Sequence, residues 1–302
     1  MRTFIFSFLV ITLADGCSRT ASNFDAAAHK KDVEEWQQQR AAGISSDSSW
    51  LTLFGLFWLK EGENRFGSDA SNDIVFPLGK APGSAGTFHL RNGVVSLEAQ
   101  PDAGIQFHDS VVGSLLLNSD ADGLGAPTVL KLGPLTFFVI KRGDQFAIRA
   151  RDKDNPARKN FKGLEFFPID PKWRVEARFE PYDPPRIIPI ATIINTVEND
   201  TCPGRLVFQI DGTACTLQAV KERGTPDKLF IMFSDETSGK ETYGLGRQMY
   251  ADLPKDNNVI LDFNKSYNWP CVYTEYATCP IPPRQNRLPV RVEAGEKMYR
   301  GH

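Results

Sequence analysis

The stretch WRVEARFE, residues 173–180, decides the fold class predicted for this chain. Every second residue is apolar, namely Trp173, Val175, Ala177 and Phe179, and the residues between them are all Arg or Glu. Successive side chains of a β-strand point to opposite faces, so this period of two predicts a strand with one buried and one solvated face. Such a strand belongs in an antiparallel sheet that packs one face on a core.

Strand-length apolar runs continue on both sides of residues 173–180. After it, the predicted strands are Ile187–Val197, Arg205–Ile210, Thr213–Val220, Leu229–Phe233 and Val259–Phe263. Before it, they include Val94–Leu97, Leu115–Leu117, Val129–Leu132, Leu135–Ile140 and Phe146–Arg149, in a sandwich or barrel of about eight strands. Turns such as Asn92-Gly93 and Asp211-Gly212 separate the runs. The sequence therefore predicts an all-β protein with two β-rich halves of sandwich or barrel type.

One short amphipathic helix is predicted ahead of the strands, over Phe24–Ala42. Asn23 can cap its first turn, Gly43 can end it, and Trp36 would pack on the following domain. The charged segment Asp152 to Pro171 is the predicted domain junction. The predicted divisions are a signal peptide at 1–17, a tether and helix at 18–49, an N-terminal β-sandwich at 50–152, a junction at 153–172 and a C-terminal β-domain at 173–302.

The first 17 residues have the form of an export signal. Arg2 precedes an apolar run of ten residues, Phe4 to Leu13, about half the ~20 residues that a membrane-spanning helix needs. The run leads into Leu-Ala-Asp-Gly-Cys, which resembles the bacterial lipoprotein signal, in which the cysteine, here Cys17, is lipidated. We therefore expect a lipid-anchored protein on the periplasmic face of the bacterial cell envelope, and a plain secretory signal is the alternative.

The remaining four cysteines predict disulfides, because export leads to an oxidising compartment. Cys271 and Cys279 can close a small loop between prolines, and Cys202 and Cys215 can meet across a hairpin. Neither pair has the C-x2–4-C spacing of a structural zinc site, so no metal is predicted.

The overall charge gives no sign of a strongly charged partner. The chain has 35 Lys and Arg against 37 Asp and Glu, a net charge of -2, which offers no field that would attract nucleic acid or an anionic membrane surface. We predict no nucleic-acid partner and membrane contact through the lipid anchor only. The lone Gly244-Leu-Gly246 lacks the third glycine of a dinucleotide loop, and no cofactor is predicted.

Polar side chains are densest between Ser234 and Lys297, in a segment that prolines prevent from forming a long helix or a central strand. Arg247 can bind a carboxylate or phosphate, or it can pair with Glu241 or Asp262 and hold loops together. Asp262 can act as an acid, a base or an oxygen ligand, or it can close a turn. The predicted ligand-binding residues are Glu241, Tyr243, Arg247, Asp262, Asn264, Tyr267, Asn268, Asn286 and Arg287.

Two function hypotheses follow from this surface. The first is a binding or accessory module of the cell envelope for a small molecule or glycan. The second is a hydrolase that uses the carboxylates of Glu241 and Asp262, and its test is the separation of those two groups. A Ser-His-Asp hydrolase is disfavoured, because the chain has four histidines and no G-x-S-x-G. The sequence leaves open whether the protein is an enzyme.

The run GENRFGSDASNDIVFP, residues 62–77, resembles the start of a forkhead-associated sandwich. That family has an arginine directly after the glycine, whereas Ser68 follows Gly67 here, and no Ser-x-x-His follows. The resemblance therefore implies the sandwich without its phosphothreonine site.

A second resemblance covers Trp50 to Lys297. The sequences GLFWLKEGENRFGSD, RDKDNPARKNFKGLEFFPIDP, ETYGLGR, DFNKSYNWPC, TCPIPP, NRLPV and AGEK resemble the family of domains of unknown function 1684. Trp269 departs from the family, which more often has proline there. The resemblance implies no activity.

Overall fold

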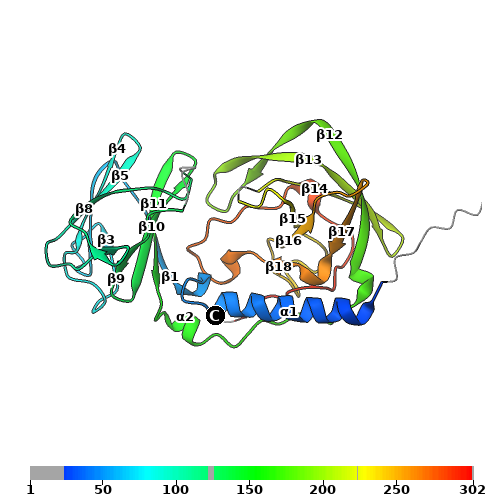
Figure 1. The fold of residues 1–302 in the computed structure, drawn as a ribbon, viewed down its shortest axis with the longest axis horizontal. Helices are drawn as coiled ribbons and strands as arrows, with labels where there is room; N and C mark the ends of the chain where they lie inside the picture. The colour runs from blue at the N-terminus through cyan, green and yellow to red at the C-terminus, as the bar shows by residue number, and fades with distance from the viewer. Residues whose placement is uncertain (1–23, 122–125, 223, 301–302) are drawn as a thin grey trace, which may run out of the picture.

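The computed structural model describes residues 24–121, 126–222 and 224–300. The signal segment and Cys17 lie outside the described residues. Within them the chain is mainly β-structure, so the predicted all-β class is confirmed. Figure 1 shows a sandwich at one end, a second β-domain at the other, and the helix α1 (Ala26–Ser45) running along the second domain.

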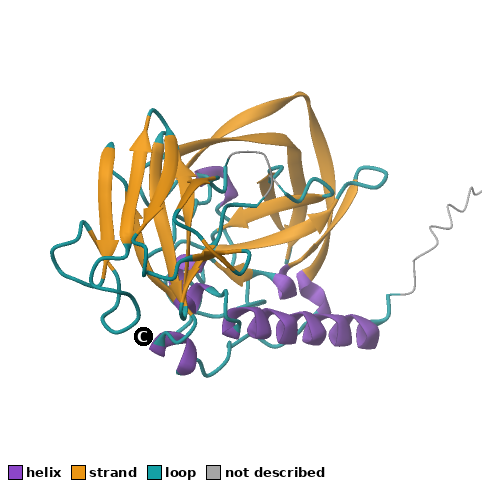
Figure 2. Cartoon of the chain, turned by 60° about the vertical axis from the view of Figure 1, so that its left-hand side comes forward, coloured by secondary structure: helices purple, strands orange, loops and turns teal. Residues whose placement is uncertain are grey.

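Two sheets facing each other form the N-terminal sandwich (Figure 2). One sheet has the strand order β1 (Leu53–Trp58), β11 (Gln145–Asp152), β10 (Leu135–Arg142), β9 (Leu130–Leu132), β6 (Gln106–Phe107) and β7 (Ser110–Val111). The other has the order β3 (Ile74–Val75), β2 (Gly62–Gly67), β4 (Gly86–Arg91), β5 (Val94–Ala99) and β8 (Ser114–Leu117). The strands outnumber the predicted eight because β3, β6 and β7 have two residues each, too short to show a period.

Phenylalanine rings hold the two sheets of the sandwich together. Phe66 stacks on Phe88 within one sheet with ring centroids 4.3 Å apart, and Phe137 of the opposite sheet meets Phe66 edge-on at 5.8 Å. All three rings are completely buried. Burial of each ring stabilises the sandwich by about 1.5–3 kcal/mol.

The C-terminal domain also has two sheets. The first has the order β14 (Thr213–Ala219), β13 (Val197–Ile210), β12 (Arg174–Ala191) and β17 (Asn258–Asp262), and the second has the order β15 (Lys228–Phe233), β16 (Arg247–Asp252) and β18 (Tyr267–Asn268). A bridge between Val220 and Phe230 connects the sheets at one side. Trp173, Ala177, Leu206, Leu217, Ile231, Phe233 and Phe263 are among the residues of their shared core.

The alternating stretch 173–180 follows the predicted burial pattern in part. Trp173 and Ala177 are buried and Glu176 is exposed, whereas Val175 and Phe179 are half-buried. Trp173 itself ends the short helix η2 (Pro171–Trp173), and β12 begins at the next residue. The hairpin at Asp211-Gly212 is also confirmed, because β13 and β14 pair on either side of it, and the two residues have φ of 47° and 77°.

The predicted strand Ile187–Val197 is wrong in its middle. Residues up to Ala191 complete β12, and a turn intervenes before β13 begins at Val197. Asn195 has φ of 60° in that turn, and the hydroxyls of Thr192 and Thr196 are 2.7 Å apart. β-Branched residues carry high strand propensity even in such a turn, which explains the error.

The helix α1 begins two residues later than predicted and includes Gly43. Asp25 caps it, because its carboxylate accepts hydrogen bonds from the backbone N–H groups of Ala27 at 2.9 Å and Ala28 at 3.0 Å. Asn23, the predicted cap, lies outside the described residues. Trp36 packs against Phe166 and Tyr267 of the later chain. No helix of the described residues is long and apolar enough to cross a membrane.

Short helical turns complete the described fold: α2 (Pro156–Lys159), η1 (Trp50–Thr52), η3 (Phe263–Lys265), η4 (Pro270–Val272) and η5 (Arg284–Asn286). The proline-broken segment contributes to the core of the C-terminal domain, because Leu288, Val292 and Ala294 are buried in it.

The four described cysteines are free thiols. The predicted Cys202–Cys215 disulfide is wrong. Cys215 pairs with Phe208 in the β13–β14 ladder, six residues along the strand from Cys202, which is about 20 Å at the usual rise per residue. Cys271 and Cys279 are neighbours, because the backbone N–H of Cys271 donates to the Sγ atom of Cys279 at 3.2 Å.

Candidate functional site

Arg247, the first predicted anion-binding residue, is completely buried and connects separate segments of the chain. Its guanidinium donates to Asp235 at 2.7 Å and to the backbone carbonyls of Val292, at 2.9 Å, and Ala294. Burial lowers the pKa of Arg247, and Asp235 opposes that shift. The ion-pair partner is therefore neither Glu241 nor Asp262, and the hydrogen bonds to the two carbonyls fix the C-terminal segment onto β16.

Glu241 and Asp262 have separate partners. Glu241 pairs with Arg291 at 2.6 Å on the surface, which lowers the pKa of Glu241. Asp262 accepts a hydrogen bond from the backbone N–H of Asn264 at 3.2 Å, as the cap of η3, and its other oxygen lies 2.8 Å from Nε2 of His29. Asp262 thus closes a turn and docks α1.

The amides of Asn264 and Asn286 connect segments that are distant in the sequence. Asn264 exchanges two hydrogen bonds of 3.1 Å with the backbone of Asp170. Asn286 accepts from the backbone N–H of Gln218 at 2.7 Å and donates to the carbonyls of Gln218 and Met232, both at 2.8 Å. Both amides are more than nine-tenths buried.

The other predicted residues lie in different places, and Arg287 is exposed. Arg287 forms a backbone bridge with Ser234. Burial, followed by a hydrogen bond with Cys271, raises the pKa of Tyr243. Tyr267 and Asn268 are the two members of the predicted set that line the cavity described next. The nine predicted residues therefore do not form one surface.

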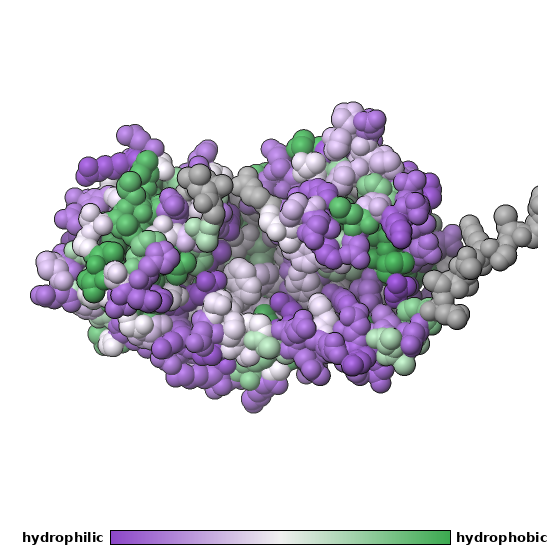
Figure 3. Space-filling model, in the orientation of Figure 1, coloured by the Kyte–Doolittle hydropathy of each residue, from purple (hydrophilic) through white to green (hydrophobic). Residues whose placement is uncertain are grey.

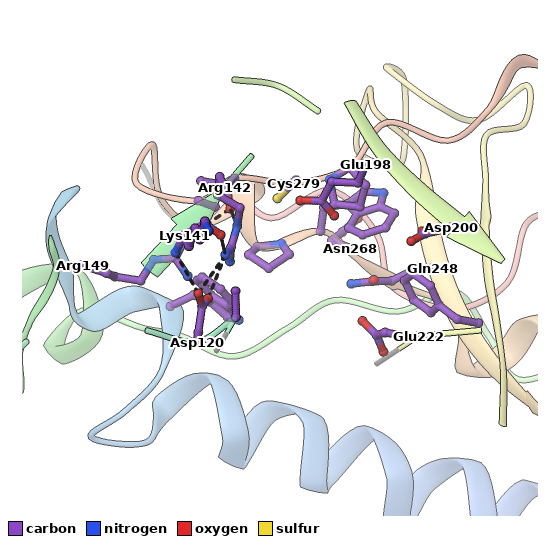
Figure 4. A pocket seen from close by; sticks show the side chains of 18 of the residues that line it. Asp120, Lys141, Arg142, Arg149, Glu198, Asp200, Glu222, Gln248, Asn268 and Cys279 are labelled. Carbon is purple, nitrogen blue, oxygen red and sulfur yellow. Dashed lines mark hydrogen bonds and ion pairs between the residues drawn. The ribbon is translucent and has the colours of Figure 1, made fainter. Parts of the chain in front are cut away.

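A cavity of about 890 Å³ lies between the sandwich and the C-terminal domain (Figure 3). Arg40 of α1 and Trp50 of η1 also line it. Six of its charged lining residues form two groups, which Figure 4 shows on opposite sides. We refer to Lys141, Arg142 and Arg149 as the basic wall and to Glu198, Asp200 and Glu222 as the acidic wall.

The cations of the basic wall outnumber the carboxylate beside them. Asp120 binds Nη1 of Arg142 through both oxygens, at 2.8 and 3.1 Å, and Thr278 accepts from Nε of Arg142 at 3.0 Å. Lys141 extends its ammonium over the ring of Phe146 at 5.1 Å. The basic wall is thus incompletely neutralised by the described residues around it.

Arg149 is the least compensated of these cations. It is 4% exposed, donates to the hydroxyl of Thr278 at 3.3 Å, and lies 5.4 Å from the ring of Trp50. Among the described residues no carboxylate forms an ion pair with it, and its Nε has no hydrogen-bond partner. Burial and the charge of Arg142 lower the pKa of Arg149 to about 10, although Asp120 opposes the shift.

The acidic wall has the opposite imbalance. Burial raises the pKa of Asp200, and the charges of Glu198 and Glu222 raise it further. Within the described ranges neither Glu198 nor Asp200 has a side-chain hydrogen bond or an ion pair. Glu222 accepts a hydrogen bond from the hydroxyl of Tyr250.

Aromatic side chains line the cavity between the two walls: Trp50, Phe230, Tyr250, Tyr267 and Trp269. Phe230 has ring centroids 5.1 Å from Tyr250 and 6.0 Å from Trp269. The guanidinium of Arg40 lies 4.5 Å from the centroid of Tyr267. The lining therefore combines apolar faces with charges of both signs, as small-molecule sites do.

The sequence predicted neither wall, because the residues of each wall become neighbours only in the fold. One local signal was present. Arg149 interrupts the run Phe146-Ala-Ile-Arg-Ala, in which all five residues are buried. Charged residues are rarely buried without a partner, so an arginine inside a predicted core strand marks a position that needs a counter-ion.

The chain is similar in sequence to a protein of known structure. It is 32% identical to an uncharacterized protein of Haloarcula marismortui, solved by NMR, over 46% of this chain and 78% of that one, with a TM-score of 0.38. Two FHA-domain structures match at 16% identity and a TM-score of 0.22 over 32% of this chain, covering 97% and 92% of theirs. One is the FhaA FHA domain in complex with the intracellular domain of a second protein, and the other comes from work on phosphothreonine-dependent FHA interactions.

No curated protein matches the chain. The model of a family described as proteins of unknown function, DUF1684, matches residues 159–297. This confirms the family suggested by the later sequence resemblances, while GLFWLKEGENRFGSD, residues 55–69, lies before the matched region. The chain, through residues 159–297, belongs to the DUF1684 family.

Proposed function

We propose that the protein binds a small molecule in the cavity between its two domains, with an anionic group of the ligand on the basic wall. Arg149 carries this proposal. An arginine that is 4% exposed and without an ion-pair partner among the described residues is electrostatically unfavourable in the empty protein. A bound carboxylate or phosphate would remove that penalty by supplying the counter-charge that Arg149 lacks.

The size of the cavity supports a ligand rather than a few bridging waters. Its volume of about 890 Å³ falls in the range of small-molecule sites, about 300–1,000 Å³. The fork of a guanidinium also matches the geometry of two oxygens of one carboxylate or phosphate.

We further propose that this binding takes place in the cell envelope, on an exported and lipid-anchored protein. The signal-like sequence that ends at Cys17 supports this compartment.

We favour binding over the hydrolase hypothesis. That hypothesis requires the carboxylates of Glu241 and Asp262 to act on one substrate. Glu241 is paired with Arg291, Asp262 is paired with His29, and neither carboxylate lines the cavity between the domains.

The test is isothermal titration of the mature protein with ethyl phosphate, comparing the wild type with Arg149→Met. The matched control is Arg151→Met, two residues along β11 and outside the cavity lining. We expect the wild type to bind one equivalent, and Arg149→Met to bind on the order of 10- to 100-fold more weakly, as for a lost hydrogen bond to a charged group. Equal affinity of wild type and Arg149→Met would contradict the proposal.

A further inference from the structure

The acidic wall needs a cation as much as the basic wall needs an anion. Asp200 and Glu198 have no basic partner among the described residues, although Asp200 is partly buried. Like charges that face a common space repel each other, and the raised pKa of Asp200 has the charges of Glu198 and Glu222 among its causes. The wall is therefore set up to gain from a bound positive group.

A second observation at the same wall indicates a ligand. Gln248 is 8% exposed, and its side-chain amide has no hydrogen bond within the described part of the chain. Figure 4 shows this amide between Asp200 and Glu222, directed into the cavity. An amide side chain that is more than nine-tenths buried is normally hydrogen-bonded, so Gln248 marks a position where a ligand atom would lie.

The donor set favours an organic cation over a metal ion. The three carboxylates of the acidic wall do not form a group that could hold one metal ion, and no such group occurs among residues 24–121, 126–222 and 224–300. Tyr250 and Trp269 supply aromatic rings in the same lining, and ring faces attract ammonium groups. A protonated amine can bind carboxylates, an amide oxygen and ring faces together.

We propose that the ligand is bipolar, with a carboxylate or phosphate on the basic wall and a protonated amine between Asp200 and Glu222. This inference rests on the proposed function, because it takes the anion site as given. The two walls lie on different domains, so one ligand would contact Arg142 and Arg149 of the sandwich and Asp200 of β13 at once. Ligands with one charge would satisfy half of the site.

The test uses matched pairs of probes that differ by the amine. O-Phosphoethanolamine is compared with ethyl phosphate, and 6-aminohexanoate with hexanoate, by isothermal titration of the mature protein. The two pairs separate phosphate from carboxylate as the anionic group. Each is measured on the wild type, on Asp200→Asn, and on Asp211→Asn as the control at the exposed β13–β14 turn.

We expect the amine to raise affinity at least tenfold in at least one pair, and Asp200→Asn to remove that advantage while ethyl phosphate binds as before. Asp211→Asn should behave as the wild type. Thermal unfolding of each variant, with its transition compared with that of the wild type, shows that the fold is retained.

Two results would overturn the inference. If ethyl phosphate and O-phosphoethanolamine bind equally, and hexanoate and 6-aminohexanoate also bind equally, the anion site stands and the amine site is wrong. If Asp200→Asn keeps the full advantage of the amine, another group binds it. If none of the four probes binds the wild type, and Arg149→Met gives the same titration as the wild type, the proposed function itself is contradicted.

Discussion

Arg149 and Arg247 are both buried arginines, but their surroundings differ. Arg247 has the carboxylate of Asp235 at 2.7 Å and two backbone carbonyls. Arg149 has a hydroxyl and a ring face. A buried cation that is paired with a carboxylate has a structural role. A buried cation without such a partner needs a counter-ion from outside the protein.

This contrast predicts opposite changes in the free energy of unfolding. Arg149→Met should stabilise the unliganded protein by about 1–3 kcal/mol, because an uncompensated charge is replaced by an apolar side chain. Arg247→Met should destabilise it by about 3–5 kcal/mol, because Asp235 is left buried and unpaired. Urea unfolding of both variants measures the difference, and a loss of similar size in both would contradict the distinction.

Asp200 gives a pH-dependent prediction. Burial raises its pKa above the ordinary value of 3.8, so the folded protein binds a proton more tightly there than the unfolded chain does. Its contribution to stability is therefore most favourable below pH 3.8 and is lost as the pH rises through the folded pKa. Asp200→Asn should gain stability relative to the wild type between pH 4 and pH 7. Urea unfolding at several pH values measures the difference in the free energy of unfolding between the two proteins. If that difference does not change over this range, the pKa of Asp200 is not raised by folding.

At the scale of elements, α1 is fixed to the C-terminal domain by charge pairs as well as by the predicted packing of Trp36. Lys265 pairs with Asp32 at 2.6 Å, and Arg40 pairs with Glu296 at 3.2 Å. Glu296 is completely buried and also accepts from the hydroxyl of Tyr273. Through Arg40 the helix also contributes to the lining of the cavity.

Arg40→Ala should accordingly destabilise the protein by about 3–5 kcal/mol, because it removes one partner of a buried pair. Lys30→Ala on the same helix is the control, since the exposed pair of Lys30 with Glu34 contributes at most about 0.5 kcal/mol. Thermal or urea unfolding of both variants would refute the docking role if their losses were equal.

The loop that carries η4 gives a prediction about thiols. Cys271 and Cys279 are free thiols in the structure, with a hydrogen bond from the backbone N–H of Cys271 to the Sγ atom of Cys279. The disulfide predicted between them is expected only in an oxidising compartment. Thiol counting under denaturing conditions, on protein from its native compartment, should find the thiols of Cys202 and Cys215 and no others. Four free thiols would end the disulfide prediction.

At the scale of the whole molecule, local patterns predicted the elements and missed how they assemble. The period of two at residues 173–180 and the turn at Asp211-Gly212 report on neighbouring residues, and the structure has both. Arg149 of the sandwich and Asp200 of the C-terminal domain line the same cavity. They are far apart in the sequence, so no local period connects them. The predicted site failed to assemble for a related reason. Polar residues in a proline-broken segment, such as Asn264 and Asn286, satisfy the backbone groups that a regular sheet would pair by itself.

The most direct test of the central claim is to locate a bound anion. Crystals of the mature protein soaked in selenate, measured at the selenium edge, would show the anion through its anomalous scattering. We predict a peak within hydrogen-bond distance of the guanidinium groups of Arg142 and Arg149, and its disappearance in Arg149→Met crystals. Peaks confined to the outer surface, with none at the basic wall, would contradict the account.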